Sequence, residues 1–376
     1  MVKIRFFLII FLLFLLSGCS TRPKLLLLNW GEYINEEAVE RFEREYGIDV
    51  IINIADSNEM FYSKLLSGTT VYDLIIPSEY MVEKMVGKDL LQKFDLNLLS
   101  NYNSGNPLMP GVNGIMDSMF PGFSDYAIPY FWGTFGLMYN KNKEGLEEAV
   151  VNFGWEAYFN SEKRPTGTRI GMYDVPRFAY AASLLAMDLS PNAVGDDYLE
   201  KAAALLGKVD FQEWGTDTLK KGIVADNLDL AFVYTGDFLD MLYIKLENNN
   251  LEDIHFDIHI PDDTIAFMDS FVIPKKARHV DIAHKFVNFF LRNEIAYLNA
   301  SVIGYCTPLL ATYQEITSYE GSDPWLSAWA YANRVYYPLP EPGSEKYFLG
   351  TPLANLERDF IKRINIMINN VKAGDE

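Results

Sequence analysis

Residues 25 to 77 read LLLLNWGEYINEEAVERFEREYGIDVIINIADSNEMFYSKLLSGTTVYDLIIP, and the pattern of this stretch decides the fold. Three short apolar runs, at residues 25–28, 50–54 and 74–76, predict buried parallel strands. Each intervening segment begins with a residue that can cap a helix and ends at a glycine, from Asn35 to Gly47 and from Ser57 to Gly68. The order strand, helix, strand, helix, strand is the unit of a doubly wound α/β sheet.

The carboxyl ends of these three strands are the places where a ligand is expected. In open α/β sheets, ligands bind just beyond the carboxyl ends of the strands. Here those ends are residues 29–33, 56–59 and 77–80, which are rich in aromatic and acidic side chains.

The rest of the chain predicts a second α/β region and two segments that cross between lobes. The expected crossings are residues 126–139 and 265–273, which are extended and strongly apolar. The other expected elements are strands at 169–172 and 229–234 and helices at 197–206, 280–291 and 353–371. We therefore expect an α/β protein with two discontinuous lobes: residues 25–133 with 268–312 form the N-terminal lobe, and residues 134–267 with 313–376 form the C-terminal lobe.

The start of the chain is typical of an exported lipoprotein. Lys3 and Arg5 precede an apolar run at residues 6–16, and Ser17 and Gly18 come just before Cys19. We expect residues 1–18 to be a signal peptide and residues 19–24 to be a linker anchored by acylation of Cys19. Two or more acyl chains hold a protein stably on a membrane, here expected to be the inner membrane facing the periplasm. A plain signal peptide with an incidental cysteine is the alternative.

Charge and cysteine content narrow the possible partners. The chain of 376 residues has a formal net charge of −19, which becomes −21 when Lys3 and Arg5 are removed with the signal peptide. Such an acidic body argues against binding to nucleic acid and is compatible with cationic ligands, although a solvated acidic surface explains it equally well. Cys306 is the cysteine left besides Cys19, so we expect no internal disulfide.

Motifs for catalysis and cofactor binding are missing from the sequence. There is no G-x-x-x-x-G-K-[ST], no G-x-G-x-x-G after a predicted strand, and no G-x-S-x-G. Of the four histidines, His255 and His259 are four residues apart but lie in a segment predicted to be extended, so they do not form a helical metal pair. We therefore expect a binding protein and not an enzyme, with no cofactor and no metal.

Aromatic rings and carboxylates recur together at the predicted strand ends and crossings. The groups are Trp30 with Glu32 and Tyr33, Glu79 with Tyr80, Tyr234 with Asp237, and Phe267 with Asp269. Ring faces attract an organic ammonium by roughly 0.5–2 kcal/mol each, and a carboxylate offsets the cost of removing its charge from water. Two acidic ends separated by rings would select a diamine or polyamine. The alternative is that many of these rings only fill the core, because 14% of the residues are aromatic.

Five spaced motifs resemble the spermidine/putrescine-binding proteins (PotD-type) of ABC uptake systems. They are Leu27-Leu28-Asn29-Trp30-x-Glu32-Tyr33, Tyr72-Asp73-Leu74-Ile75-Ile76-Pro77-Ser78-x-Tyr80, Ile128-Pro129-Tyr130-x-Trp132-Gly133, Met268-Asp269-Ser270-x-x-Ile273-Pro274 and Ile303-Gly304-Tyr305-x-Thr307-Pro308. The resemblance implies a two-lobed periplasmic binding protein of type II character, with lobes joined by hinge strands. It also implies a receptor that closes around a polyamine and delivers it to a membrane permease.

The same resemblance implies a set of ligand-binding residues. Asp269 would face the amine, with Tyr305 as a flanking ring, and Tyr234 and Phe267 stand where the family usually has tryptophan. The set is Trp30, Glu32, Tyr33, Ser78, Tyr80, Asp174, Tyr234, Phe267, Asp269 and Tyr305. Phe178 stands where the family has the glutamate that binds the far end of the ligand. We therefore expect putrescine to bind at least as well as spermidine.

Other functions stay open at this point. Tyr336-Tyr337 is compatible with a ferric-ion-binding transport lipoprotein, because tyrosine pairs can hold iron in lobed binding proteins. A surface hydrolase would need a nucleophile and a base that the sequence does not reveal, and an anchored adhesin is a further possibility. In each case we expect a monomer.

Overall fold

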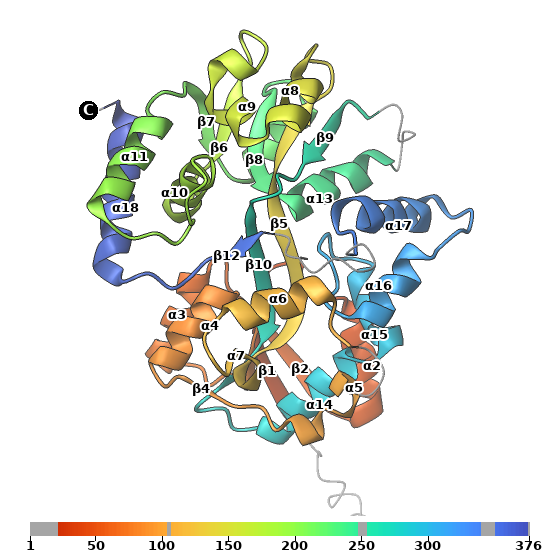
Figure 1. Ribbon diagram of the computed structural model, residues 1–376. Helices are drawn as coiled ribbons and strands as arrows, with labels where there is room; N and C mark the ends of the chain where they lie inside the picture. The colour runs from red at the N-terminus through yellow and green to blue at the C-terminus, as the bar shows by residue number, and fades with distance from the viewer. Residues whose placement is uncertain (1–21, 104–106, 247–253, 340–349, 375–376) are drawn as a thin grey trace, which may run out of the picture.

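The computed structural model describes residues 22–103, 107–246, 254–339 and 350–374, and it consists of two α/β lobes joined by long strands (Figure 1). The predicted signal peptide and Cys19 lie outside the described residues. Within the described ranges, no helix is both long enough and apolar enough to span a bilayer.

The N-terminal lobe is built on the sheet that the first strands form. Its order is β2-β1-β3, all parallel, with β1 at Lys24–Asn29, β2 at Asp49–Ile54 and β3 at Leu74–Ile75. Helix α2 (Glu36–Tyr46) begins where the side chain of Asn35 accepts from the Ala38 N–H, and it ends at Gly47, whose φ of 66° is left-handed. Helix α3 (Asn58–Ser67) is capped by Ser57 and ends at Gly68. The predicted strand and helix order is confirmed.

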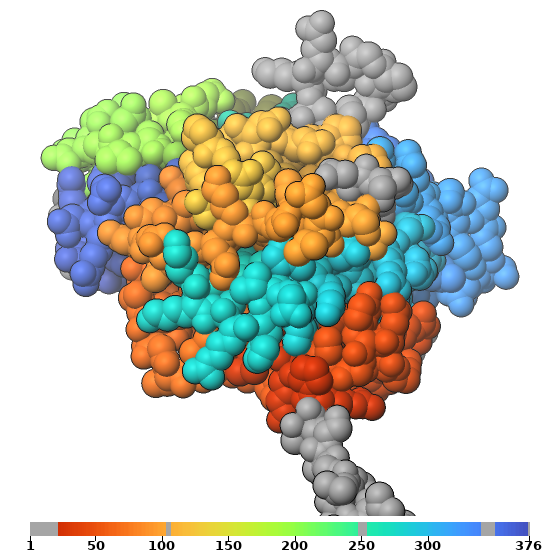
Figure 2. Space-filling model, turned by 90° about the horizontal axis from the view of Figure 1, so that it is seen from below, coloured from red at the N-terminus to blue at the C-terminus, as the bar shows by residue number. Residues whose placement is uncertain are grey.

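Segments from the second half of the chain complete this lobe. Figure 2 shows the cyan segment, which includes α14, lying between the red and the orange parts of the surface. The ring of Phe286 on α14 contacts that of Phe42 on α2, with ring centroids 5.0 Å apart, and both side chains are fully buried. The remaining elements of the lobe are α4 (Glu79–Gly87), β4 (Leu91–Gln92), a 3-10 turn (Leu96–Leu98), α5 (Ser100–Asn103), α6 (Pro110–Ser118), α7 (Phe123–Tyr126), β11 (Ile273–Pro274), α14 (Val280–Phe290), α15 (Asn293–Ala300) and α16 (Leu310–Thr317).

The strands β5 (Ile128–Asn140) and β10 (Ile265–Phe271) run through both lobes side by side (Figure 1). They pair antiparallel, with Gly133 opposite Phe267, and every residue of both strands is buried. A third, short strand, β12 (Thr351–Pro352), pairs with β10 and was not predicted. Because of it, the last helix, α18 (Arg358–Ala373), begins five residues later than the predicted start at Leu353.

The C-terminal lobe contains the outer strands of the larger sheet and the helices that cover them. The sheet order is β12-β10-β5-β8-β6-β7, and β9 also pairs with β5. The strands predicted at 169–172 and 229–234 are confirmed within one residue as β6 (Ile170–Tyr173) and β8 (Leu230–Tyr234). The other elements are α8 (Leu146–Phe153), α9 (Trp155–Phe159), a 3-10 turn (Ser161–Lys163), α10 (Pro176–Leu185), α11 (Asp196–Leu206), β7 (Phe211–Gly215), α12 (Asp217–Val224), α13 (Thr235–Leu246), β9 (Phe256–His259) and α17 (Pro324–Tyr336).

Candidate functional site

Asp269 lies on the crossing strand β10, where the pairing register with β5 shifts between Asp269 and Ser270. Such irregularities re-aim a side chain out of the regular alternation of a strand. The carboxylate accepts a 2.6 Å hydrogen bond from the hydroxyl of Ser78 and a 2.9 Å hydrogen bond from the hydroxyl of Tyr33. Tyr33 follows β1 and Ser78 follows β3, so both donors come from the strand ends at which a ligand was expected.

The carboxylate of Asp269 is buried without a cationic partner among the described residues. Burial raises the pKa of Asp269 to about 6, while the hydrogen bonds from Ser78 and Tyr33 act in the opposite direction. At neutral pH the group is therefore mostly ionised, with two neutral donors to stabilise it. A buried carboxylate in this state is stabilised further by any cation that reaches it.

The neighbouring side chains hold these donors in place. Asn58 donates from Nδ2 to the Ser78 hydroxyl and accepts from the Ser78 N–H, both at 3.0 Å. The indole N–H of Trp30 donates to the carbonyl of Ile76 at 2.8 Å, and its ring lies 4.9 Å from that of Phe61 between centroids. These contacts fix two of the predicted ligand-binding residues of the N-terminal lobe, Trp30 and Ser78.

Four rings form a continuous series from one lobe to the other, which we call the aromatic row: Tyr33, Tyr305, Phe267 and Tyr234. Successive centroids are 5.8, 5.3 and 5.1 Å apart, and each pair meets edge to face. Tyr33 belongs to the N-terminal lobe, whereas Tyr234 is the last residue of β8 in the C-terminal lobe. Four of the predicted site residues are therefore brought together.

Two glycines allow the rings of the aromatic row to lie this close to the backbone. A Cβ atom at Gly133 would be 2.8 Å from Cζ of Phe267, and one at Gly236 would be 2.0 Å from Cε1 of Tyr305. Gly236 lies in the first turn of α13, so Tyr305 of the N-terminal lobe contacts the backbone of the C-terminal lobe directly. Any side chain at either position would displace a ring of the row.

A second carboxylate, Asp237, approaches the aromatic row from the C-terminal lobe. Its Oδ1 accepts a 3.0 Å hydrogen bond from Nζ of Lys220, whereas its Oδ2 is fully buried and has no hydrogen-bond partner among the described residues. Burial raises the pKa of Tyr305 and of Tyr173, and the charge of Asp237 adds to the rise in both. Sequence reasoning noted Asp237 beside Tyr234 but left it out of the predicted site. The sequence did offer a signal for Asp237, because it lies in the first turn of α13, directly after the end of strand β8.

Glu79, which follows Ser78 in α4, is also buried beside Asp269. Its Oε2 accepts a 2.9 Å hydrogen bond from the Met268 N–H of β10. Burial raises the pKa of Glu79 to about 8, and the nearby charge of Asp269 adds to the rise. Glu79 thus joins helix α4 to the crossing strand, a role that was not predicted.

Three of the predicted site residues, Glu32, Asp174 and Tyr80, belong neither to the hydrogen-bonded group around Asp269 nor to the aromatic row. Glu32 is exposed, with a left-handed φ of 51°, and no hydrogen bond or ion pair reaches its carboxylate within the described residues. Asp174 is exposed and forms an ion pair with Lys372 of α18. Tyr80 is partly buried, and the charge of Arg177 from the C-terminal lobe counters the burial that raises its pKa.

The tyrosine pair behind the ferric alternative does not form a metal site. The hydroxyl of Tyr336 donates to Asp257 at 2.6 Å, and Tyr337 is fully buried against Trp132, with ring centroids 5.5 Å apart. In the part of the chain that the structure describes, no group of three or more His, Cys, Asp and Glu side chains could hold a metal. The structure thus offers the ferric alternative no support.

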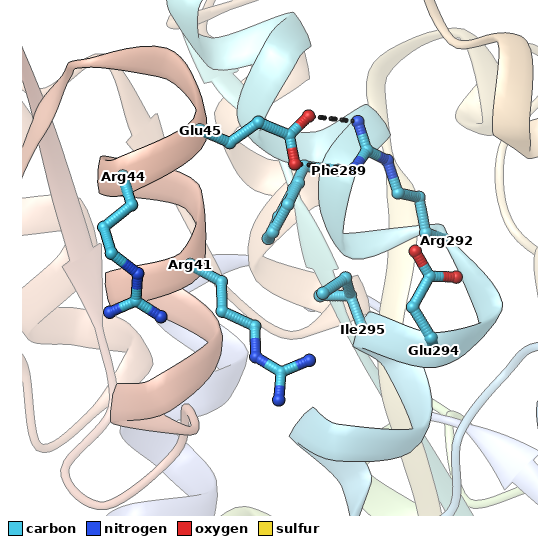
Figure 3. A pocket seen from close by; sticks show the side chains of 7 residues that line it. All are labelled: Arg41, Arg44, Glu45, Phe289, Arg292, Glu294 and Ile295. Carbon is cyan, nitrogen blue, oxygen red and sulfur yellow. Dashed lines mark hydrogen bonds and ion pairs between the residues drawn. The ribbon is translucent and has the colours of Figure 1, made fainter.

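A surface pocket elsewhere is lined mainly by paired arginine and glutamate side chains. A hollow of about 420 Å³ lies between α2 and the α14–α15 corner of the N-terminal lobe (Figure 3). Arg41 and Arg44 extend from α2 at one side, and Arg292 pairs with Glu45 at the other at 2.7 Å. None of the predicted site residues lines this pocket. Each of its three arginines is paired with a glutamate, Arg41 with Glu37, Arg44 with Glu40 and Arg292 with Glu45, and Glu294 also lines the pocket.

Comparison with known proteins agrees with this architecture. A family model described as bacterial extracellular solute-binding protein matches residues 37–332. The chain is 29% identical over 276 residues to the putrescine-binding periplasmic protein SpuD of Pseudomonas aeruginosa, covering 71% of this chain and 73% of that protein. It is 28% identical over 286 residues to the spermidine/putrescine-binding periplasmic protein of Escherichia coli, covering 75% and 77%.

Among solved structures, the spermidine/putrescine ABC transporter substrate-binding protein PotD of Streptococcus pneumoniae is similar. Its TM-score is 0.75 at 26% sequence identity, covering 94% of this chain and all of that one. The expected two-lobed binding-protein fold is confirmed.

Proposed function

The chain belongs to the family of bacterial extracellular solute-binding proteins, and we propose that it captures a small polyamine, with putrescine at least as good a ligand as spermidine. We propose further that it delivers the amine to an ABC permease. The observation that carries the proposal is Asp269: a buried carboxylate with two neutral donors and no described cationic partner, beside a row of rings. The names of the relatives support the same ligand class.

In this proposal, each end of the amine has its own carboxylate. One ammonium binds Asp269, and the second binds the unpartnered Oδ2 of Asp237. Burial raises the pKa of Tyr305, and the charges of both acids add to the rise, so both carboxylates act on the same hydroxyl. The methylene groups of the ligand then lie along the aromatic row, whose faces also attract the ammonium ends.

The proposed preference for a short diamine rests on the far end of the site. Phe178, which replaces the family's far-end glutamate, packs on Tyr234 and Phe135 with centroid distances of 5.9 and 4.9 Å. Asp174 is engaged by Lys372, which also lies 4.8 Å over the ring of Trp214. A third charged amine, as in spermidine, would meet an apolar ring there and lose its hydration without compensation.

We propose that closure of the two lobes traps the ligand. The proposed lobe boundaries, between residues 133 and 134 and between residues 267 and 268, fall inside β5 and β10. A ligand that contacts Asp269 from one side and Asp237 from the other binds only the closed form well, so it shifts the population towards closure. The closed form is then the one that the permease recognises.

Titration calorimetry of the purified protein with putrescine and with spermidine tests the proposal. Asp269→Asn should weaken putrescine binding about 100-fold, or roughly 3 kcal/mol, because it removes the counter-charge of a buried ammonium. Asp359→Asn is the matched control, because this side chain is 91% exposed on α18, and it should bind as the wild type does. Unchanged affinity in Asp269→Asn would exclude this residue from the site, and a tenfold preference for spermidine would contradict the proposed selectivity.

Acylation of Cys19 is the proposed means of holding the receptor at the periplasmic face of the inner membrane, as a monomer. The motif Leu16-Ser17-Gly18-Cys19 supports it, and only a few residues separate Cys19 from the start of β1 at Lys24. Mass spectrometry of the N-terminal peptide from the membrane fraction should find acyl chains on Cys19. Cys19→Ser should instead appear without acyl chains in the soluble fraction.

A further inference from the structure

Lys220 is a nearly buried ammonium surrounded by acids. It lies on α12, and its side chain is 10% exposed. Its Nζ donates to Oδ1 of Asp237 at 3.0 Å and to Oδ2 of Asp240 at 3.1 Å, and lies 4.0 Å from Oδ1 of Asp217. Burial lowers the pKa of Lys220, but the two hydrogen-bonded acids outweigh it, so its pKa is raised overall and the group stays charged.

Asp237 is the member of this cluster that connects it to the proposed ligand site. Asp240 and Asp217 are 53% and 66% exposed, whereas the side chain of Asp237 is only 12% exposed. Its Oδ1 accepts a hydrogen bond from Lys220, and its buried Oδ2 has no partner in the part of the chain that the structure describes. The described groups that act on Asp237 are Lys220 and Asp217 from α12, Asp240 from α13, Tyr173 from β6 and Tyr305 from the N-terminal lobe.

We propose that Lys220 is a positioning residue for ligand capture: it keeps Asp237 ionised and fixes its carboxylate so that Oδ2 is available to the second ammonium of a diamine. This inference rests on the proposed function of the site. A buried carboxylate without a counter-charge takes up a proton, and a neutral carboxyl group attracts an ammonium far less. Lys220 prevents this without occupying Oδ2.

Lys220 could instead act on the ligand directly, and this effect on affinity would have the opposite sign. An ammonium close to the site repels a cationic ligand, so a lysine that acted only through its charge would weaken binding. Its removal would then strengthen binding at every pH. The two roles are therefore distinguished by the sign of the change and by its pH dependence.

The experiment is a comparison of putrescine affinity, measured by calorimetry at pH 6.5, 7.5 and 8.5, for wild type and Lys220→Met. We expect the variant to bind at least tenfold more weakly than wild type at pH 6.5, and this deficit to shrink as the pH rises, because Asp237 then ionises without help. Dividing by the wild-type affinity at each pH removes the contribution of Asp269, which both proteins share. Lys220→Arg, which keeps the charge, should restore most of the affinity.

Two further variants separate positioning from a general loss of structure. Asp240→Asn removes the charge of the other acid that Lys220 contacts but leaves the hydrogen bond to Asp237, so its affinity should stay within about twofold of wild type at each pH. In an Asp237→Asn background, Lys220→Met should no longer change the pH profile, because the group it acts on is gone. A deficit that is independent of pH, a gain in affinity, or a full effect in the Asp237→Asn background would overturn the inference. Failure of the wild type to bind any diamine would instead refute the proposed function.

Discussion

The hydroxyl of Tyr33 donates a 2.9 Å hydrogen bond to Oδ2 of Asp269, although 236 positions separate the two residues in the sequence. Tyr33 follows the first strand of the N-terminal lobe, and Asp269 lies on a strand that runs through both lobes. The bond therefore ties the loop that carries Trp30 to the element through which the lobes are joined. Asp269, the proposed ligand carboxylate, thus lies on β10, one of the two strands proposed as a hinge. Protonation of Asp269 should therefore weaken both ligand binding and the lobe closure that binding stabilises.

The affinity of the wild-type protein for putrescine should fall as the pH drops below about 6. Burial raises the pKa of Asp269 to about 6, so the carboxylate gains a proton in this range, while the ammonium groups of the ligand stay charged. Well below that pH, a proton competes with the ligand and each further pH unit should cost about tenfold in affinity. Calorimetry between pH 4.5 and 7.5 measures the profile. An affinity that stays constant down to pH 4.5 would contradict a role for an ionised Asp269.

Tyr33→Phe should move this pH dependence to higher pH. The substitution removes one of the two donors that hold the pKa of Asp269 down, so the carboxylate should protonate at a higher pH than in wild type. At pH 7 the affinity for putrescine should drop by about tenfold, since a hydrogen bond to a charged group contributes roughly 1.5–3 kcal/mol. Tyr62→Phe is a control, because the ring of Tyr62 lies 4.6 Å from Nζ of Lys84, whereas the donors to Asp269 are Ser78 and Tyr33. A profile for Tyr33→Phe that matches wild type would show that the bond does not tune Asp269.

Glu79→Gln should stabilise the folded protein at neutral and alkaline pH. Burial raises the pKa of Glu79 to about 8, whereas a glutamate in the unfolded chain titrates near its ordinary pKa of about 4.3. Between these values the folded state holds a proton that the unfolded state has lost, so stability falls as the pH rises through this window. Glutamine cannot ionise, and it can still accept from the Met268 N–H.

Denaturant unfolding at pH 5 and at pH 8.5 checks this expectation. The stability gain of Glu79→Gln over wild type should be small at pH 5 and should reach a few kcal/mol at pH 8.5. Glu162→Gln, at an exposed position, should show no such change with pH. A gain that is equal at both pH values would mean that Glu79 does not titrate in the folded protein as its burial indicates.

Much of this site could be predicted from local sequence, and the failures share a physical cause. The capping residues Asn35 and Ser57 and the glycines that follow each helix act within a few residues, so α2 and α3 were predicted correctly. The four residues of the aromatic row were each predicted as site residues, but their contacts with one another were not. Strand β12 was missed because it is only two residues long and depends on pairing with β10, 86 residues earlier at its first pair.

The charged groups were harder to predict than the rings. Whether a carboxylate at a strand end faces the ligand depends on partners that are remote in sequence. Asp174 is paired with Lys372 from the last helix, and Glu79 is buried because α4 packs against β10. Asp237 likewise has its hydrogen-bond partner, Lys220, on another helix, and its charge acts on Tyr305 of the other lobe. Glu32 has no such partner among the described residues, and its place in the ligand site stays a prediction.

Gly236→Ala should oppose closure of the lobes. The added Cβ would lie 2.0 Å from a ring atom of Tyr305, so the ring and the loop that carries it would have to move away from α13. We expect putrescine affinity to fall at least tenfold while thermal stability of the C-terminal lobe changes little, because the contact joins the two lobes and is not inside one. Adding Tyr305→Ala to Gly236→Ala should remove the clash, so the alanine at 236 should then cost no further affinity. Equal losses in both backgrounds would show that the alanine acts elsewhere.

Phe178→Glu should shift selectivity from putrescine towards spermidine. The ring of Phe178 packs against Tyr234 at the end of the aromatic row, where the resemblance to polyamine-binding proteins implies a carboxylate for the far end of the ligand. A glutamate there would give the third amine of spermidine a counter-charge, so the ratio of spermidine to putrescine affinity should rise about tenfold or more. Loss of the ring should weaken both ligands through lost packing, which is why the ratio is the informative quantity. Phe178→Gln has the same shape without the charge and should leave the ratio near its wild-type value. Phe178→Gln could instead raise the ratio as much as Phe178→Glu does. The ring would then act by filling space and not by excluding a charged amine. In that case the apolar far end of the site would not explain the preference for the shorter amine.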